Sequence, residues 1–277
     1  MTRLGLLIDV TRCSGCHNCF LACRDEHFGN DYPGYSKPQP AHGQFWLQVK
    51  EIERGSYPRP RLDYIAVPCQ HCENAPCEAA ATDGAVYRRA DGIVMFDPDK
   101  AVGQKQLVNA CPYRVVFWNE ELQLPQKCNF CAHRLDEGEK VPRCVESCPT
   151  GAMTFGDLDD PQSEVSQRLA EVSGEVFHAE YETGPHVCYH GLPGRMVAGE
   201  VVFEGADVCA SGVKVTLVGD GESRELVSGT YGDFVFEPLP NGATYTLTVA
   251  ADGYETVTCE VRTHTDVELG EVVLAKA

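Results

Sequence analysis

Short hydrophobic runs recur along this chain, and their spacing differs between its two ends. Near the N-terminus, LGLLIDV (residues 4–10) and later GIVMFD (residues 92–97) are apolar runs of the length expected for short buried strands. The run QFWLQVKEIE (residues 44–53) predicts a strand pair inside a Pro-, Gly- and Tyr-rich excursion over residues 24–68, which we expect to dock a partner or to cover a neighbouring site. Residues 160–173 have the spacing of one amphipathic surface helix.

From about residue 196 the pattern changes to alternation. Val213, Val215 and Leu217 alternate with Lys214 and Thr216, as a strand with one buried face requires. Gly, Pro, Asn and Asp residues separate successive runs, and several short strands at this spacing predict an all-β sandwich. The runs are EVVFEG (200–205), VKVTLV (213–218), DFVFEPL (233–239), TYTLTVAA (244–251) and ETVTCEVR (255–262).

Composition narrows the class of protein. A formal net charge of −18 over 277 residues argues against nucleic acid as a partner, because phosphate binding needs clustered Lys and Arg. No run approaches the roughly 18–20 apolar residues of a transmembrane helix, and the first apolar run is too short for a secretory signal. We therefore expect no membrane segment and a cytoplasmic location. Fifteen cysteines are far above ordinary use and have to be explained first.

Twelve of the cysteines fall into four groups between residues 13 and 148. The first group, CSGCHNCFLAC, has the C-x2-C-x2-C-x3-C spacing of bacterial ferredoxins. Cysteines three residues apart on a tight loop can direct their thiolates at one cluster, whose fourth ligand comes from another loop. The groups are Cys13, Cys16, Cys19 and Cys23; then Cys69, Cys72 and Cys77; then Cys111 alone; and then Cys128, Cys131, Cys144 and Cys148.

This exchange of ligands divides the twelve cysteines into three complete sets, which predicts three [4Fe–4S] clusters. The first set is Cys13, Cys16, Cys19 and Cys148; the second set is Cys23, Cys128, Cys131 and Cys144; the third set is Cys69, Cys72, Cys77 and Cys111. The same spacing marks four positions without a cysteine, all of which would serve one further cluster. They are occupied by Ala81, Ala101, Gln104 and Leu107. We therefore expect one whole cluster to be absent.

Zinc and disulfides are the alternative uses of these cysteines. Structural zinc also takes four cysteines, but usually as two C-x2-C pairs and without three consecutive cysteines at this spacing. A disulfide framework needs an oxidising compartment, for which the chain shows no signal. Three histidines lie within the cysteine groups, and we expect each at the surface beside a cluster and not as a ligand: His17, His71 and His133.

The four cysteine groups, with FGDLDDPQSEVSQRL (155–169) and GPHVCYHGLP (184–193) after them, resemble the iron–sulfur (beta) subunits of dimethyl sulfoxide reductase-type molybdopterin oxidoreductases. The resemblance covers about residues 1–193. It implies two intertwined ferredoxin-like modules, one from the first and fourth loops and one from the second and third. It also implies a large catalytic partner subunit that holds molybdenum bis-pterin guanine dinucleotide. Members normally carry four clusters, so this chain departs from the family at the four vacant positions.

The C-terminal runs resemble the carboxypeptidase regulatory-like or Cna-B-type domain, which implies a transthyretin-like β-sandwich. The expected fold is therefore α+β: a ferredoxin-like iron–sulfur domain over residues 1–195, with an insertion at about 24–68 and a linker at about 157–195, and a sandwich over residues 196–277. Cys259 alternates in step with Val257 and Val261 and is expected to be a buried core thiol. No role is assigned to Cys188 or Cys209.

The expected function is electron transfer, because [4Fe–4S] centres move electrons and no nucleotide loop, catalytic triad or paired acidic motif accompanies the cysteines. Catalysis is therefore expected on the partner subunit of a molybdopterin enzyme. One alternative is a respiratory dimethyl sulfoxide or polysulfide reductase, in which the clusters would form a relay toward a membrane anchor. Another is a scaffold, in which clusters or zinc are folding staples and the sandwich is a docking module.

Overall fold

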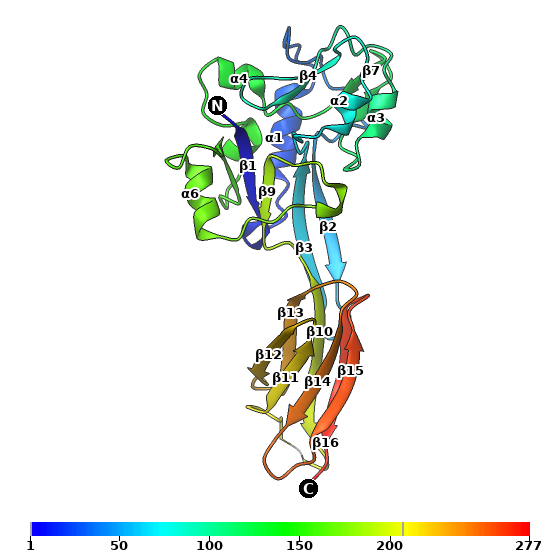
Figure 1. The fold of residues 1–277 in the computed structure, drawn as a ribbon, viewed down its shortest axis with the longest axis vertical. Helices are drawn as coiled ribbons and strands as arrows, with labels where there is room; N and C mark the ends of the chain where they lie inside the picture. Colours follow the sequence, from blue (N-terminus) through cyan, green and yellow to red (C-terminus); the bar gives the residue numbers. More distant parts are fainter. Residues whose placement is uncertain (1, 207) are drawn as a thin grey trace. The chain divides into compact units, whose positions relative to one another are not determined.

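The computed structural model describes residues 2–206 and 208–277 and divides the chain into two compact units. The first unit comprises Met1–Glu51 and Asp63–Leu192, and the second comprises Ile52–Leu62 and Pro193–Ala277 (Figure 1). The division expected from the sequence puts all of residues 1–195 in one domain, whereas the structure groups the tip of the excursion with the second unit.

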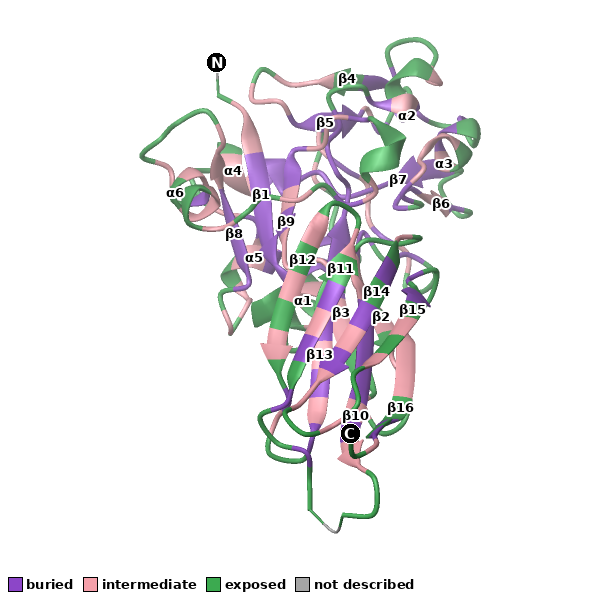
Figure 2. Ribbon diagram, turned by 60° about the horizontal axis from the view of Figure 1, so that its bottom comes forward, coloured by how far each residue is buried: buried purple, intermediate pink, exposed green. Residues whose placement is uncertain are grey.

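The first unit is built around a three-stranded sheet. The first apolar run forms its central strand, β1 (Leu4–Asp9), which is antiparallel to β8 (Met153–Asp157) and parallel to β9 (Val187–His190). β1 is buried along most of its length (Figure 2), as the run of apolar residues requires. Because β1 leads into the first cysteine group and β8 follows the fourth, this sheet brings those two groups together.

Short helices carry or adjoin the cysteines in two pairs. Helix α1 (Asn18–His27) contacts α5 (Arg143–Glu146), and α2 (Pro76–Ala79) contacts α3 (Gln106–Ala110). The first cysteine group therefore lies against the fourth, and the second lies against the third. The remaining short elements here are η1 (Val10–Arg12), β4 (Val86–Arg88), β5 (Val94–Phe96), β6 (Phe117–Asn119), β7 (Leu124–Gln126), α4 (Ala132–Asp136) and η2 (Ala179–Tyr181).

Two elements are shorter than the sequence patterns that predicted them. The surface helix is α6 (Glu164–Glu171), because Ser163 has an extended backbone and its N–H donates to the Asp160 carbonyl (2.9 Å) in a turn before the helix. The strand pair is β2 (Leu47–Arg54) with β3 (Arg61–Pro68). The chain enters β2 only after Trp46, whose buried indole N–H donates to the side chain of Gln44 (2.8 Å).

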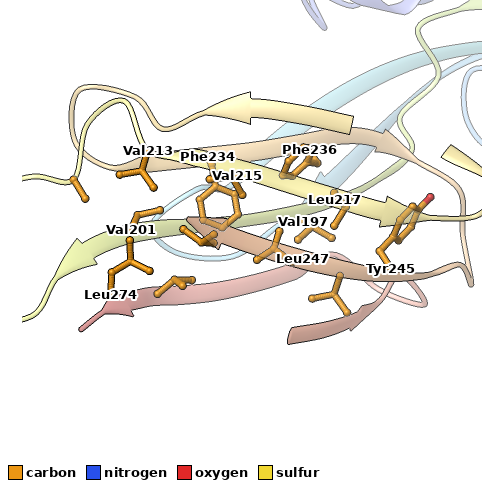
Figure 3. Packing of buried hydrophobic residues seen from close by; sticks show 14 of the residues in the cluster. Val197, Val201, Val213, Val215, Leu217, Phe234, Phe236, Tyr245, Leu247 and Leu274 are labelled. Atoms are coloured by element: carbon orange, nitrogen blue, oxygen red, sulfur yellow. The ribbon is translucent and has the colours of Figure 1, made fainter. Parts of the chain in front are cut away.

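In the second unit two sheets enclose one apolar core. Val215 and Leu217 of one strand and Tyr245 and Leu247 of its neighbour are buried, which confirms the alternation in the sequence. Figure 3 shows side chains of the two sheets meeting between the strands. One sheet has the order β13 (Asp233–Leu239), β10 (Arg195–Phe203), β16 (Val267–Leu274); the other has the order β12 (Glu222–Val227), β11 (Lys214–Gly219), β14 (Thr244–Ala250), β15 (Val257–Arg262).

The tip of the β2–β3 hairpin is held in this second unit by polar contacts. Arg59 forms an ion pair with Glu268 (3.0 Å), and both side chains are largely buried. The Gly55 N–H donates to Asp266 (2.9 Å), and Arg54 donates to the Gly194 carbonyl (2.8 Å). Basic residues of the excursion thus meet acidic residues of the C-terminal region, a pairing that neither segment reveals alone.

The three cysteines outside the sets have different surroundings. Cys259 is half-buried and packs against the apolar core of the second unit, so it is less enclosed than the expected core thiol. Cys259 is only half-buried because β15 is an edge strand of its sheet, with a neighbouring strand on one side only. Cys188 lies in β9 and is half-buried, and Cys209 is exposed.

Candidate iron–sulfur sites

The first set surrounds one pocket. Its four cysteines line about 380 Å³ of space free of protein atoms, together with Val49 of β2 and Ala66 of β3. Gly15, between the cysteines, has a φ of +65°, and a side chain there would collide with the ring of Tyr64 in β3. The base of the excursion therefore covers this pocket, which is one of the two roles expected for it.

The third set surrounds a second pocket. Its cysteines line about 340 Å³ of space whose walls include Val94, Val116 and Lys127. Arg88 holds the loop from outside, because its guanidinium donates to the carbonyls of Cys72 (2.6 Å) and Glu73 (2.8 Å). Three cysteines of one loop and one of the next are thereby placed around the same cavity.

The second set is the most deeply enclosed, with each cysteine 8% exposed or less. Burial raises the pKa of the Cys144 thiol well above its ordinary value, and negative charge on Cys131, Cys128 and Cys23 would raise it further. The same four thiols therefore influence one another's charge, and Cys19 of the first set also acts on Cys144. Phe130 has a φ of 53° and directs its N–H at the Cys128 sulfur (3.4 Å).

Burial perturbs the thiols of all three sets in the same direction. It raises the pKa of Cys19, Cys77 and Cys131 to about 12 and that of Cys72 and Cys128 to about 11. Such thiols are protonated at neutral pH, so they become ligands when a metal displaces the proton. Four cysteines around one space are the donor set of a [4Fe–4S] cluster, and the residues present fit that group.

All fifteen cysteines are free thiols. Within residues 2–206 and 208–277, no three Cys, His, Asp or Glu side chains are arranged to hold one metal ion. The cysteines of the first and third sets each line one pocket.

At the vacant positions the structure is packed with apolar side chains. Ala101 and Leu107 are fully buried. Ala81 packs against a small apolar cluster that contains Ala101, Ala85 and Leu124. Apolar side chains therefore occupy three of the four positions from which further ligands would come.

Gln104, the polar member of the four, connects the two loops. Its Nε2 donates to the carbonyls of Thr82 (3.2 Å) and Lys100 (3.0 Å), and its Oε1 accepts from the Thr82 N–H (3.0 Å). A cluster at this place would join the second and third loops through iron–sulfur bonds. One amide side chain joins the same loops through hydrogen bonds.

The expectation that all three histidines lie at the surface is wrong for two of them. His17 is partly exposed and lies 3.4 Å from Glu51. His71 is fully buried, because its ring stacks on Phe130 (3.8 Å between ring centres) and its Nδ1 accepts from the Val94 N–H (3.1 Å). His133 is also buried, with Nε2 2.9 Å from a carboxylate oxygen of Glu26.

Sequence reasoning missed Lys127, which lies between two sets. It is buried directly before Cys128 and lines the pocket of the third set. The available signal was its position, because a lysine in the otherwise uncharged run LQLPQKCNFCA is unusual beside buried cysteines.

No helix among the described residues has the length and apolar character needed to cross a bilayer. A family model described as a 4Fe-4S dicluster domain matches residues 60–158. A second, described as a carboxypeptidase regulatory-like domain, matches residues 196–274. The two units thus contain an iron–sulfur domain and a regulatory-like β domain.

Curated relatives cover most or all of the chain. The pyrogallol hydroxytransferase small subunit of Pelobacter acidigallici is 39% identical over 99% of this chain and 100% of its own. The iron–sulfur subunit of a putative dimethyl sulfoxide reductase of Halobacterium salinarum is 37% identical over 72% of this chain and 82% of its own. A tetrathionate reductase subunit of Salmonella typhimurium is 36% identical over 70% of this chain and 75% of its own. With its cysteine sets and these similarities, the chain belongs to the family of iron–sulfur electron-transfer subunits of molybdopterin oxidoreductases.

Proposed function

We propose that this chain is the small subunit of a pyrogallol–phloroglucinol hydroxytransferase and holds three [4Fe–4S] clusters, one in each set. The similarity to the Pelobacter acidigallici subunit carries this proposal, because it extends over both units. The two reductase subunits match only 70–72% of the chain. The packed fourth position supports a count of three, since Gln104 and Leu107 occupy the place of further ligands.

Charge interactions between cysteines of different sets support electron transfer in the order first, second, third set. Cys19 of the first set is among the groups whose negative charge would raise the pKa of Cys23 and Cys144 in the second. Cys69 of the third set acts in the same way on Cys128 of the second. A bound [4Fe–4S] cluster supplies one-electron transfer. The helix pairs α1–α5 and α2–α3 support two intertwined ferredoxin-like modules as the frame for this relay.

The substrate site belongs in this proposal to a large partner subunit. That subunit would hold molybdenum bis-pterin guanine dinucleotide and exchange hydroxyl groups between polyhydroxybenzenes, in a cytoplasmic heterodimer. The role of this chain is to anchor the clusters in a water-poor interior and to hold them at fixed separations. Its buried thiols suit this role, because thiolate sulfur is the ligand of iron–sulfur clusters.

The test is anaerobic purification of the native complex with metal analysis and a hydroxyl-transfer assay. Three clusters predict about twelve iron atoms per heterodimer, with one molybdenum on the partner. Transfer between pyrogallol and phloroglucinol would support the proposal. An iron content near sixteen, which is about four [4Fe–4S] clusters, would contradict the cluster count.

A respiratory reductase is the second candidate, favoured by the similarity to the tetrathionate reductase subunit. A quinol-oxidising membrane subunit in the purified complex, together with reductase activity and no hydroxyl transfer, would select it over the hydroxytransferase.

A further inference from the structure

Lys127 is a buried cation without an anionic side chain beside it. Its relative exposure is 4%, and its Nζ donates to the carbonyls of Val94 (2.5 Å) and Cys128 (3.0 Å). The ammonium also lies 5.1 Å from the centre of the Phe96 ring. Throughout the described part of the chain, no carboxylate lies within 4.0 Å of it in an ion pair. Burying an ammonium in this way is costly unless negative charge compensates it.

The position of Lys127 indicates which groups would supply the negative charge that compensates its ammonium. Its side chain lines the pocket of the third set, and its backbone continues into Cys128 of the second. Its ammonium donates to the carbonyl of Cys128 (3.0 Å), and its side chain borders the same pocket as Cys77. One ammonium therefore acts on two neighbouring sets.

The surrounding contacts hold this ammonium in place. Val94, whose carbonyl accepts from Lys127, donates its N–H to His71. The His71 ring stacks on Phe130, which belongs to the loop of the second set. Lys127 is therefore fixed between both cluster loops, and little reorganisation is needed when the charge beside it changes.

A [4Fe–4S] cluster held by four thiolates is a net anion, and accepting an electron makes it more negative. A fixed cation stabilises the reduced state more than the oxidised state, so it raises the reduction potential. This effect is strong where water is excluded, as it is around the second set.

We propose that Lys127 is the shared counter-charge of the second and third clusters and raises the reduction potential of both. This inference rests on the proposed function, because it requires a cluster in each of these two sets. Lys127 is not among the described residues that line the pocket of the first set, so the first cluster serves as an internal reference.

The test compares Lys127→Met, which keeps the length of the side chain but removes the charge, with Lys127→Arg, which keeps the charge. Each full-length protein is purified anaerobically with its co-purifying subunit and titrated with dithionite and mediators, with cluster reduction followed by EPR. In Lys127→Met we expect the reduced-to-oxidised ratio of the second and third clusters at a fixed potential to fall about tenfold, a shift of about 59 mV to lower potential. The first cluster should be unchanged, and Lys127→Arg should resemble the unaltered protein.

Lys105→Met is the matched control. Lys105 also lies over an aromatic ring, that of Trp118 (5.2 Å), but it is exposed and paired with Glu120 (3.4 Å). Its removal should move no potential, because solvent screens an exposed charge.

Three results would overturn the inference: unchanged potentials in Lys127→Met, equal shifts of all three clusters, or a shift in Lys127→Arg as large as in Lys127→Met. If Lys127→Met loses iron, normal iron content and potentials in Lys127→Arg support the counter-charge, and iron loss in both variants overturns it. Failure of the proposed function is recognised separately, because the unaltered protein would then lack [4Fe–4S] signals from the second or third set.

Discussion

Replacing Gln104 by leucine tests whether hydrogen bonds have taken over the connection that a fourth cluster would make. Leucine has a similar volume but cannot form the three hydrogen bonds to Thr82 and Lys100. At about 0.5–1.5 kcal/mol for each bond, the free energy of unfolding should fall by about 1.5–4.5 kcal/mol. This loss of stability should be measurable because Gln104 is only 8% exposed, so water cannot readily replace the lost hydrogen bonds.

The assay is anaerobic urea unfolding of the full chain followed by far-UV circular dichroism. With a denaturant slope of about 2–3 kcal/mol/M, the expected loss lowers the midpoint of the transition by about 1 M. Gln106→Leu is the control, because Gln106 is exposed and donates only one long hydrogen bond, to the Oε1 of Gln104 (3.3 Å), so its loss leaves the bonds of Gln104 to Thr82 and Lys100 in place. Its effect should stay within about 0.5 kcal/mol.

Two results would refute this reasoning. If Gln104→Leu is no less stable than Gln106→Leu, the hydrogen bonds of Gln104 do not stabilise the connection between the loops. If Gln104→Leu instead loses about four iron atoms, a cluster occupies the place that we describe as packed.

Three further predictions concern the sets and the units. Cys111→Ala should remove about four iron atoms and only the EPR signal of the third set, and loss of the first set's signal would show that the cysteines are grouped wrongly. Burial alone would raise the pKa of Glu26, but hydrogen bonds from His133 and Tyr32 and the charge of Arg134 lower it below 4.5. The stability that this lowered pKa provides is complete above pH 4.5 and is lost as the pH falls through the lowered pKa. Glu26→Gln should therefore flatten the fall of Tm over that pH range. Parallel curves of Tm against pH for the variant and the unaltered protein would contradict this. A chain truncated after residue 195 should keep its iron but expose residues 52–62 to proteolysis, because Asp266 and Glu268 no longer hold them; an iron-free product would show that the second unit is needed for cluster assembly.

The sequence alone predicted the candidate ligands and the buried strand faces. Cysteines three residues apart must lie on the same side of a tight loop, so spacing predicted which residues are ligands and which four positions are vacant. Alternation along residues 213–217 and 244–249 predicted buried strand faces, because side chains on a strand point to opposite sides. These inferences need only neighbours in the chain.

Tertiary structure decided everything that depends on residues distant in sequence. His71 and His133 follow the same local rule as His17, yet they are buried because Phe130 and Glu26 come from other segments. Residues 52–62 look like part of the first domain, but an ion pair and a hydrogen bond to residues more than 200 positions later hold them in the second unit. In the sequence, Lys127 differs from its neighbours only as the one charged residue of the run LQLPQKCNFCA. Its proposed role depends on the tertiary structure, which encloses one positive charge between two groups of buried sulfurs.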